Sequence, residues 1–314
     1  MSTSVLQWNL FLLVSSRKEF FYMDIELPAS LKLTLSIVNS IPIIISMFGF
    51  LGNGKVIHLL GFHIEKNPFT TCTLNLSIAD FGVFTSFLHT IGYIDQVDTI
   101  VYIYLLVTYF FLFMYNTGQY LLTAISMERC VSVIFPLWHR CHRPPHFSTL
   151  VCATIWITSF LLTVICIIIV IFRVTTKPLF YLLLMNAILC LPLMTVSTLV
   201  LFIKVCFRSQ QRNKGKALTA ILLALLFFLF LAFPFTFYVS YCYYFPHLHS
   251  LMLIGFGCSS VNSSINPIIY FLVGRRGRKS PSRVSMRAAI SRVFKDVGDC
   301  TEDKKSRTES KVMI

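Results

Sequence analysis

The sequence contains very little charge for its length. Only 13% of its 314 residues are Asp, Glu, Lys or Arg, whereas soluble proteins contain roughly 25%. Hydrophobic residues make up 56% of the chain, and its mean hydropathy is +0.74. This composition argues against a soluble globular domain and indicates an integral membrane protein.

The motifs of common enzymes are also missing. The sequence has no HExxH or GxSxG pattern, and no pair of acids is placed for general acid and base catalysis. Its last apolar segment, residues 248–273, contains no Lys, which excludes a retinal Schiff base there. We therefore expect a protein that is not an enzyme.

What the sequence does have is seven long apolar segments. Each is near or above the roughly 20 residues needed to cross about 30 Å of hydrocarbon. They are expected to be α-helices, because a helix satisfies its backbone hydrogen bonds within lipid. The segments span residues 33–61, 70–93, 100–127, 147–172, 179–206, 217–242 and 248–273.

These segments predict an all-α membrane protein, a seven-transmembrane helix bundle spanning residues 32–273. Residues 1–31 are expected to be an extracellular N-terminus. Residues 274–314 are expected to form a cytoplasmic tail, basic in its first part, with a short amphipathic helix from Arg283 to Phe294. Cys300, beyond that helix, is interpreted either as a palmitoylation site or as a free thiol.

The orientation follows from Lys and Arg, which are enriched in cytoplasmic loops. The tail opens RRGRKSPSRVSMRAAISRVFK, with eight basic residues and no acid. The N-terminus is therefore predicted outside and the C-terminus inside, in a multi-pass protein of the plasma membrane. The net charge of +14 is interpreted as this topology signal together with attraction to anionic membrane lipid, and not as a nucleic-acid surface. The other basic residues on the inner side are Lys66, Arg140, Arg143, Lys204, Arg208, Arg212, Lys214 and Lys216.

Few charges lie within the segments. Asp80 is in the second, and Glu128 and Arg129 close the third at its cytoplasmic end. An ionisable residue inside a membrane is costly and indicates function. Two structural alternatives stay open: Asp80 could be a hydrogen-bonded or protonated carboxyl of the bundle, and Glu128 and Arg129 could extend to the headgroups.

Short motifs follow one another in order along the seven segments, and together they resemble a rhodopsin-like G-protein-coupled receptor. Three longer stretches are similar to the Mas-related receptor subfamily: YNTGQYLLTAISMERCVSVIFPLWHRCHRP, NPFTTCTLNLSIAD and NSSINPIIYFLVG. The likeness extends from about Phe48 to Phe294. The short motifs are LGN with Asn53, LSIAD with Asp80, ERC at Glu128–Cys130, Trp156, Pro192, FPF with Pro234 and NPIIY at Asn266–Tyr270.

The resemblance implies a receptor that binds an extracellular ligand, a small molecule or a peptide, and activates heterotrimeric G proteins. Glu128 and Arg129 would pair at rest, and on activation Arg129, next to Cys130, would face the G protein. Arrestin and receptor kinases are further expected partners. The implied activation residues are Pro192, Pro234, Asn266, Pro267 and Tyr270.

The resemblance also implies a polar pocket in the centre of the bundle, where related receptors hold a sodium ion. Oxygen ligands around one carboxylate suit such a hard cation. However, Gly118 occupies a third-segment position that often supplies a hydroxyl, so a network of water alone is the alternative. No other cofactor is expected. The residues of this pocket would be Asp80, Asn53, Asn262, Ser263 and Asn266.

Other positions depart from the family pattern. Ala232 stands where the sixth segment normally carries a Trp, and the outer end of the third segment lacks the usual Cys. The stretch IVIFRVTTKPLFY contains no Cys either. Cys166 and Cys190 flank it and are expected within the membrane, so no disulfide is predicted in this loop.

The ligand class is indicated only by the outer half of the bundle. Amine receptors have an Asp where this sequence has Phe111, and the places of acids that recognise basic peptides fall at Cys166 and about Phe180. Aromatic residues are common instead, and they form either a ligand pocket or ordinary helix packing. As a pocket they would suit an apolar or weakly anionic ligand. They are Tyr93, Tyr109, Phe111, Tyr115, Phe235, Tyr238 and Phe256.

A polytopic transporter is the alternative function. Secondary transporters show internal repeats, interrupted helices and several buried ionisable groups along a path. This sequence shows no repeat, and Asp80 is its one central charge. A receptor is therefore favoured.

Overall fold

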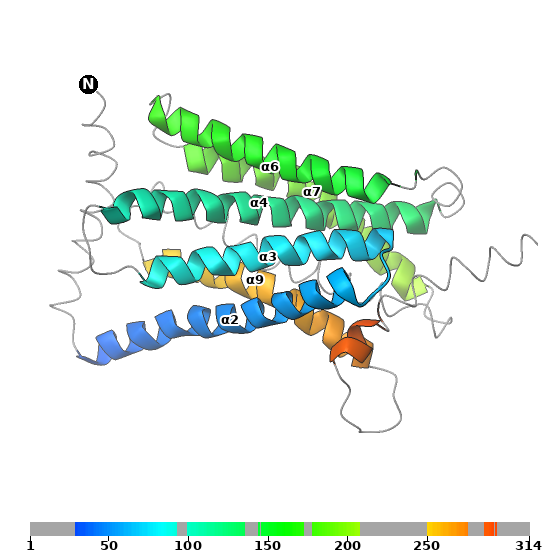
Figure 1. Cartoon of the computed structure of the whole chain (residues 1–314), viewed down its shortest axis with the longest axis horizontal. Coiled ribbons are helices and arrows are strands. Elements are labelled where there is room, and N and C mark those ends of the chain that lie inside the picture. The colour runs from blue at the N-terminus through cyan, green and yellow to red at the C-terminus, as the bar shows by residue number, and fades with distance from the viewer. Residues whose placement is uncertain are drawn as a thin grey trace, which may run out of the picture.

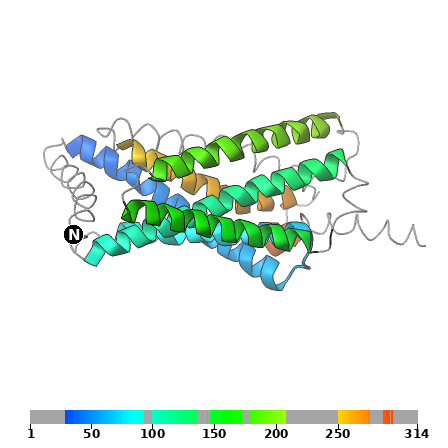
Figure 2. The same ribbon diagram turned by 90° about the horizontal axis from the view of Figure 1, so that it is seen from above.

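The computed structural model describes six long helices, drawn in Figures 1 and 2. The described residues are 29–92, 99–135, 144, 146–172, 178–207, 250–275, 286–291 and 293. The helices are α2 (Ala29–Phe62), α3 (Pro68–Gly92), α4 (Thr99–Ile134), α6 (Phe147–Ile171), α7 (Pro178–Phe207) and α9 (Ser250–Arg275).

The helix bounds follow five of the seven predicted segments closely, and the segment 217–242 lies outside the described residues. The third segment differs, because α4 continues to Ile134 whereas residue 127 was the predicted end. The prediction stopped where the apolar run meets Glu128. A helical backbone hydrogen-bonds within itself whatever the side chains are, so charged residues alone do not end it. Glu128 and Arg129 thus lie inside the helix, before its last turn.

The helices form one elongated bundle, in which α3 packs against α2, α4, α6 and α9. The long helix α4 packs against α3, α6 and α7, while α2 packs against α3 and α9. Figure 1 shows them running along a common long axis, and Figure 2 shows the same bundle from above. The helices α3 and α4, which have the most helix neighbours in the described part, contribute to most of the sites described below.

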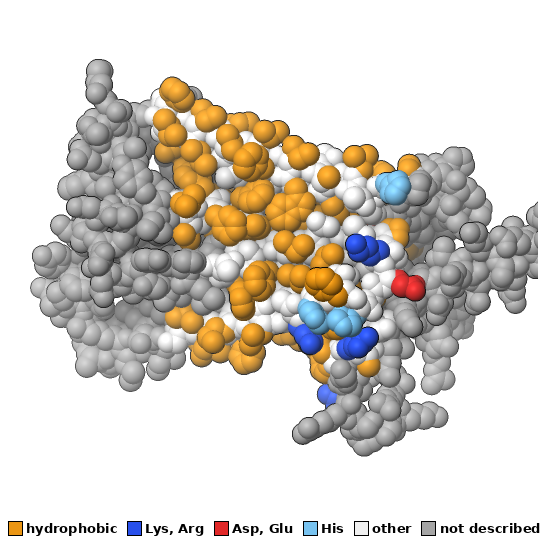
Figure 3. Space-filling view, viewed as in Figure 1, with side chains coloured by type: hydrophobic (Ala, Val, Ile, Leu, Met, Phe, Trp, Pro, Cys, Tyr) orange, Lys and Arg blue, Asp and Glu red, His pale blue; other side chains and the backbone are white. Residues whose placement is uncertain are grey.

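The outside of the bundle is apolar. Three helical stretches in the described part are long and apolar enough to cross a membrane: Ile43–Phe62, Phe147–Ile171 and Tyr181–Ile203. Figure 3 shows hydrophobic side chains over the middle of the visible face, with Lys, Arg and His at one end. We call this end, where α2 ends, α3 begins and α4 ends, the basic end.

The inside of the bundle contains many small polar side chains that join helices. At the contact of α2 with α9, the Ser46 hydroxyl donates to Ser260 Oγ at 3.2 Å, and the Ser264 hydroxyl donates to the Ile45 carbonyl at 3.1 Å. Gly49 permits this close approach, since a Cβ there would lie 2.2 Å from Phe84 Cζ and 2.3 Å from Ser264 Oγ. Small residues and interhelical hydrogen bonds are the usual means of helix association in lipid.

The predicted amphipathic stretch packs on the basic end of the bundle. Residues 286–291 are helical, and Ile290 and Val293 join the main buried cluster with Leu60 and Tyr270. Ala289 is also fully buried, while Arg287 is exposed. The spacing of the buried positions is that of one helix face. The predicted short amphipathic helix is thus confirmed over these residues.

Candidate functional site

The charged pair of α4 lies at the basic end against α3. The Arg129 guanidinium carbon is 4.0 Å from the centroid of the Phe69 ring, within the range of a cation–π contact. The Cys72 thiol, one turn along α3, lies 3.9 Å from Glu128 Oε2. Both charged side chains are half-buried. The structure therefore places Glu128 and Arg129 against two neighbouring positions of α3, and their resting pairing stays a prediction.

The helix α6 completes this corner. The Cys152 thiol lies 3.8 Å from Cys72 Sγ, and the indole N–H of Trp156 donates to Asn75 Oδ1 at 2.9 Å. These two contacts, which lie one helical turn apart, join α6 to α3. Cys130, the third residue of the predicted coupling motif, is buried on α4.

Asp80 lies in the centre of the bundle and is 4% exposed. The Asn266 side-chain amide of α9 donates to Asp80 Oδ2 at 2.9 Å, and the Ser263 hydroxyl also hydrogen-bonds to this carboxyl group. A Cβ at Gly118 would be 3.8 Å from Asp80 Oδ1, so the missing hydroxyl leaves space on the α4 side. The structure thus brings three of the five predicted polar-pocket residues into direct contact.

The other two residues of this predicted set are also buried. The Asn53 amide of α2 donates to the Gly49 and Ser263 carbonyls, both at 3.0 Å, which connects α2 to the same turn of α9. Its carbonyl oxygen Oδ1 has no hydrogen-bond partner among the described residues. Asn262 is buried beside Ser263. The centre of the bundle therefore offers one carboxylate and at least one unsatisfied oxygen.

The predicted activation residues are distributed over two helices. Pro192 lies inside α7 with its side chain exposed. Pro267 lies inside α9 and packs closely on α2, where a Cβ at Gly52 would be 3.1 Å from Pro267 Cβ. Tyr270 is buried in the main cluster, one turn beyond Asn266. Pro234 lies outside the described residues.

The predicted aromatic pocket is only partly described. The rings of Phe111 and Tyr115 stack at 5.8 Å between centroids and are buried with Val83 and Leu183, with Tyr109 packed against this group. These three residues thus take part in helix packing, and a ligand pocket beside them stays a prediction. Tyr93, Phe235 and Tyr238 lie outside the described residues, as does the side chain of Phe256.

The structure also shows functional candidates that the sequence interpretation missed. Asn186 of α7 is the centre of a buried chain of amides and hydroxyls. Its Nδ2 donates to Asn116 Oδ1 of α4 at 2.6 Å, and its Oδ1 accepts the Tyr120 hydroxyl. An Asn within the apolar run YLLLMNAILC was the available signal, since a polar amide in lipid requires a partner.

The cysteines flanking the connection between α6 and α7 are placed within helices, as expected. Cys166 of α6 and Cys190 of α7 are both buried free thiols. Cys300, the predicted palmitoylation site or free thiol, lies outside the described residues.

Comparison with known proteins gives one consistent answer. Residues 52–270 match the family model of the 7 transmembrane receptor (rhodopsin family). The chain is 36% identical to the rat protein Proto-oncogene Mas over 278 residues, covering 83% of this chain and 85% of that protein. It is 38% identical to rat Mas-related G-protein coupled receptor member H, covering 82% and 83%, and 34% identical to human member D, covering 79% and 82%.

Proposed function

Because the chain belongs to the rhodopsin family of seven-transmembrane receptors, among the Mas-related G-protein-coupled receptors, we propose that Arg129 is its contact with the G protein. The receptor class accounts for a multi-pass helical membrane protein and leaves the transporter alternative without support. In the proposed mechanism the basic end of the bundle faces the cytoplasm of a cell whose plasma membrane holds the receptor. Arrestin and receptor kinases would act on the same end.

The observation that supports this role is the position of Arg129 over Phe69. A cation held 4.0 Å from a ring centroid is retained by about 0.5–2 kcal/mol, depending on how far it is desolvated. This energy keeps the guanidinium on α3 at rest. A ligand can overcome this energy if its affinity for the active state is modestly higher than its affinity for the resting state. Glu128, beside Cys72, would hold the same resting arrangement by its charge. The contact of Arg129 with Phe69 is thus weak enough to be replaced by a contact with the G protein.

The direct test of coupling is nucleotide exchange. The full-length receptor in lipid nanodiscs is mixed with purified heterotrimers of each of the four Gα classes, and GTP-analogue binding is followed over time. We expect at least one class to exchange nucleotide several times faster than with empty nanodiscs. Exchange indistinguishable from the empty-disc rate for every class, also after adding tissue extracts as ligand sources, would contradict the coupling role.

A second part of the proposal concerns sodium. Asp80 and the Ser263 hydroxyl would hold the ion, and the space at Gly118 would admit water to complete its shell. The residues fit such an ion, since a buried carboxylate and the unpartnered Asn53 Oδ1 are oxygen donors in the same region. A bound cation would balance the buried charge of Asp80 in the resting bundle.

We expect sodium to raise the melting temperature of the purified receptor by about 2–4 °C relative to potassium at the same ionic strength. Binding at tenfold above Kd adds about 1.4 kcal/mol, and a shift of this size follows for a domain of comparable length. Asp80→Asn keeps the shape of the side chain, removes its charge and should abolish the difference. Equal melting temperatures of the wild type in both salts would favour a network of water alone.

A further inference from the structure

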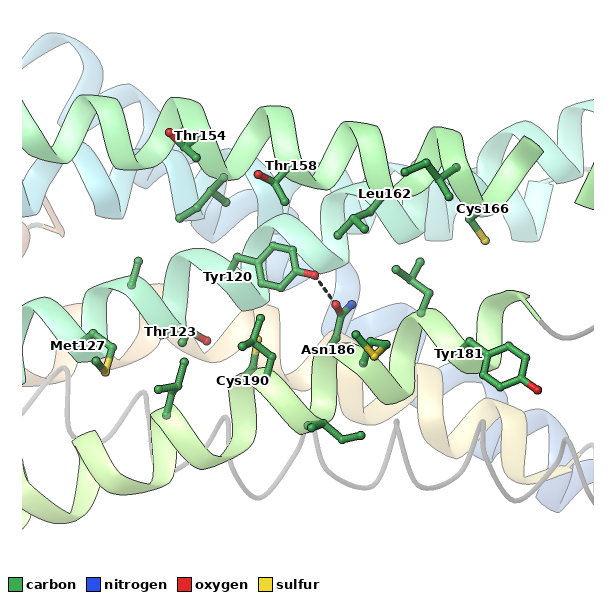
Figure 4. Close-up of a pocket in the computed structure, with 18 of the residues that line it drawn as sticks. Tyr120, Thr123, Met127, Thr154, Thr158, Leu162, Cys166, Tyr181, Asn186 and Cys190 are labelled. Carbon is green, nitrogen blue, oxygen red and sulfur yellow. Dashed lines mark hydrogen bonds between the residues drawn. The ribbon is translucent and has the colours of Figure 1, made fainter. Parts of the chain in front are cut away.

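A cavity outside the predicted ligand region lies among α4, α6 and α7. Its volume is about 750 Å³, which is within the roughly 300–1,000 Å³ of ligand-binding pockets. Figure 4 shows side chains from all three helices facing this space. Ile165, Met185 and Leu189 on its border are exposed on the apolar outer surface. The cavity therefore opens toward the hydrocarbon of the membrane rather than toward water.

Polar groups lie in the middle of this mostly apolar wall. The Tyr120 hydroxyl of α4 donates to Asn186 Oδ1 of α7, and its own oxygen keeps lone pairs that can accept a further hydrogen bond. Thr158 of α6 faces the same space (Figure 4). The lining contains no charged residue. An ionic ligand would thus find no counter-charge, whereas a neutral hydroxyl could both donate and accept.

The Thr158 hydroxyl differs from its neighbours on α6. The hydroxyls of Thr154 and Thr163 donate to carbonyls one turn earlier, at 2.9 Å each. Within the part of the chain that the structure describes, the Thr158 hydroxyl has no hydrogen bond of its own. A polar group without a partner is costly in hydrocarbon. An acyl chain of a lipid cannot supply that partner.

The depth of the polar groups restricts the ligand further. Thr158 lies near the middle of α6 (Phe147–Ile171) and Tyr120 lies well inside α4, so both are far from the headgroups of a bilayer that these helices span. A phospholipid, whose charged headgroup is held at the membrane surface, would place its polar end elsewhere. A neutral molecule that dissolves within the hydrocarbon can bring a hydroxyl to this depth.

We propose that this cavity binds a neutral, membrane-dissolved alcohol of steroid size, whose hydroxyl accepts from Thr158 and donates to Tyr120. Its apolar body fills the space between α6 and α7. Cys190 and Leu193, on either side of Pro192, line the cavity, so the bound molecule would lie against the part of α7 that contains this proline. Binding does not depend on the coupling role of Arg129, and the two proposals fail independently.

The first experiment tests the place of binding. The full-length receptor in nanodiscs is irradiated with a steroid alcohol that carries a diazirine and an alkyne, and the labelled peptides are identified by mass spectrometry. We expect labels within residues 120–127, 154–169 and 181–193. Leu189→Trp fills the cavity and should reduce labelling at least fivefold, while Leu199→Trp should leave it unchanged. Both leucines lie on α7 and are 57% exposed, but only Leu189 lines the cavity.

The second experiment tests the hydroxyl. Thr158→Val keeps the shape of the side chain and removes one hydrogen bond, which should reduce labelling about three- to tenfold. The same probe without its hydroxyl should label wild type and variant equally and weakly. The proposal would be overturned if Thr158→Val did not change labelling by the alcohol and if the alcohol labelled no more strongly than the probe without its hydroxyl. The cavity would then hold acyl chains by shape alone.

Discussion

Replacing Arg129 by Ala should abolish nucleotide exchange on the G protein while leaving the receptor folded and at the cell surface. The proposed work of this residue is in the active state, so its loss removes the proposed contact with the G protein. The cost to the resting fold is a few kcal/mol: about 0.5–2 kcal/mol from the contact with Phe69 and about 1–2 kcal/mol from the proposed charge pair with Glu128. Exchange should fall to the rate of empty nanodiscs.

The control for this variant is Lys66→Ala, which removes another cation from an exposed position at the same end and should change exchange less than twofold. Arg129→Lys keeps the charge but loses the planar fork of donors and should retain only part of the activity. If the wild type is nearly silent without a ligand, the comparison is made in the Glu128→Gln background described below. An Arg129→Ala receptor that signals like its parent at equal surface expression would show that the assigned role is wrong.

Replacing Glu128 by Gln should have the opposite effect and raise basal exchange. Glu128 is half-buried beside the Cys72 thiol at 3.9 Å. The proposed charge pair of Glu128 with Arg129 would contribute about 1–2 kcal/mol to the resting state, a value between those for exposed and for buried pairs. Removing it would increase the minor active population about 5- to 30-fold, as long as the resting state still dominates.

The matched control is Glu65→Gln, which neutralises an exposed acid at the same end of the bundle. It changes the local charge equally but breaks no proposed resting contact, so basal exchange should stay at the wild-type rate. Equal increases in both variants would indicate a general effect of charge at the basic end. No increase in either would contradict the resting role of Glu128.

The centre of the bundle is where the sequence motifs were most informative. The pattern placed Asp80, Ser263 and Asn266 in one pocket, and the structure joins them by hydrogen bonds across a separation of 186 residues between Asp80 and Asn266. A buried polar side chain in lipid has few positions where its hydrogen bonds can be satisfied. The family resemblance implied that these residues meet, and the constraint on buried polar groups is the physical reason that it holds here.

The cavity among α4, α6 and α7 was not predictable in this way. Leu189 lines it and Leu199 does not, although both are exposed leucines in the same apolar helix. In water, the buried face of a helix is apolar and the outer face is polar, so the period of 3.6 residues distinguishes them. In a membrane both faces are apolar, and this distinction is lost.

By itself, the sequence of this protein determined the membrane class and six of the helices to within a few residues, except at the end of α4. Through its resemblance to a family, it also indicated which of its rare buried polar groups meet. Only the tertiary structure decided that Arg129 lies over Phe69, that Asn186 joins Asn116 to Tyr120, and that Thr158 faces a cavity open to lipid. The number and length of helices depend on local hydrophobicity, which the sequence states directly. The contacts depend on how each helix is rotated and placed against its neighbours, and uniformly apolar surfaces specify that rotation only through the packing of the whole bundle.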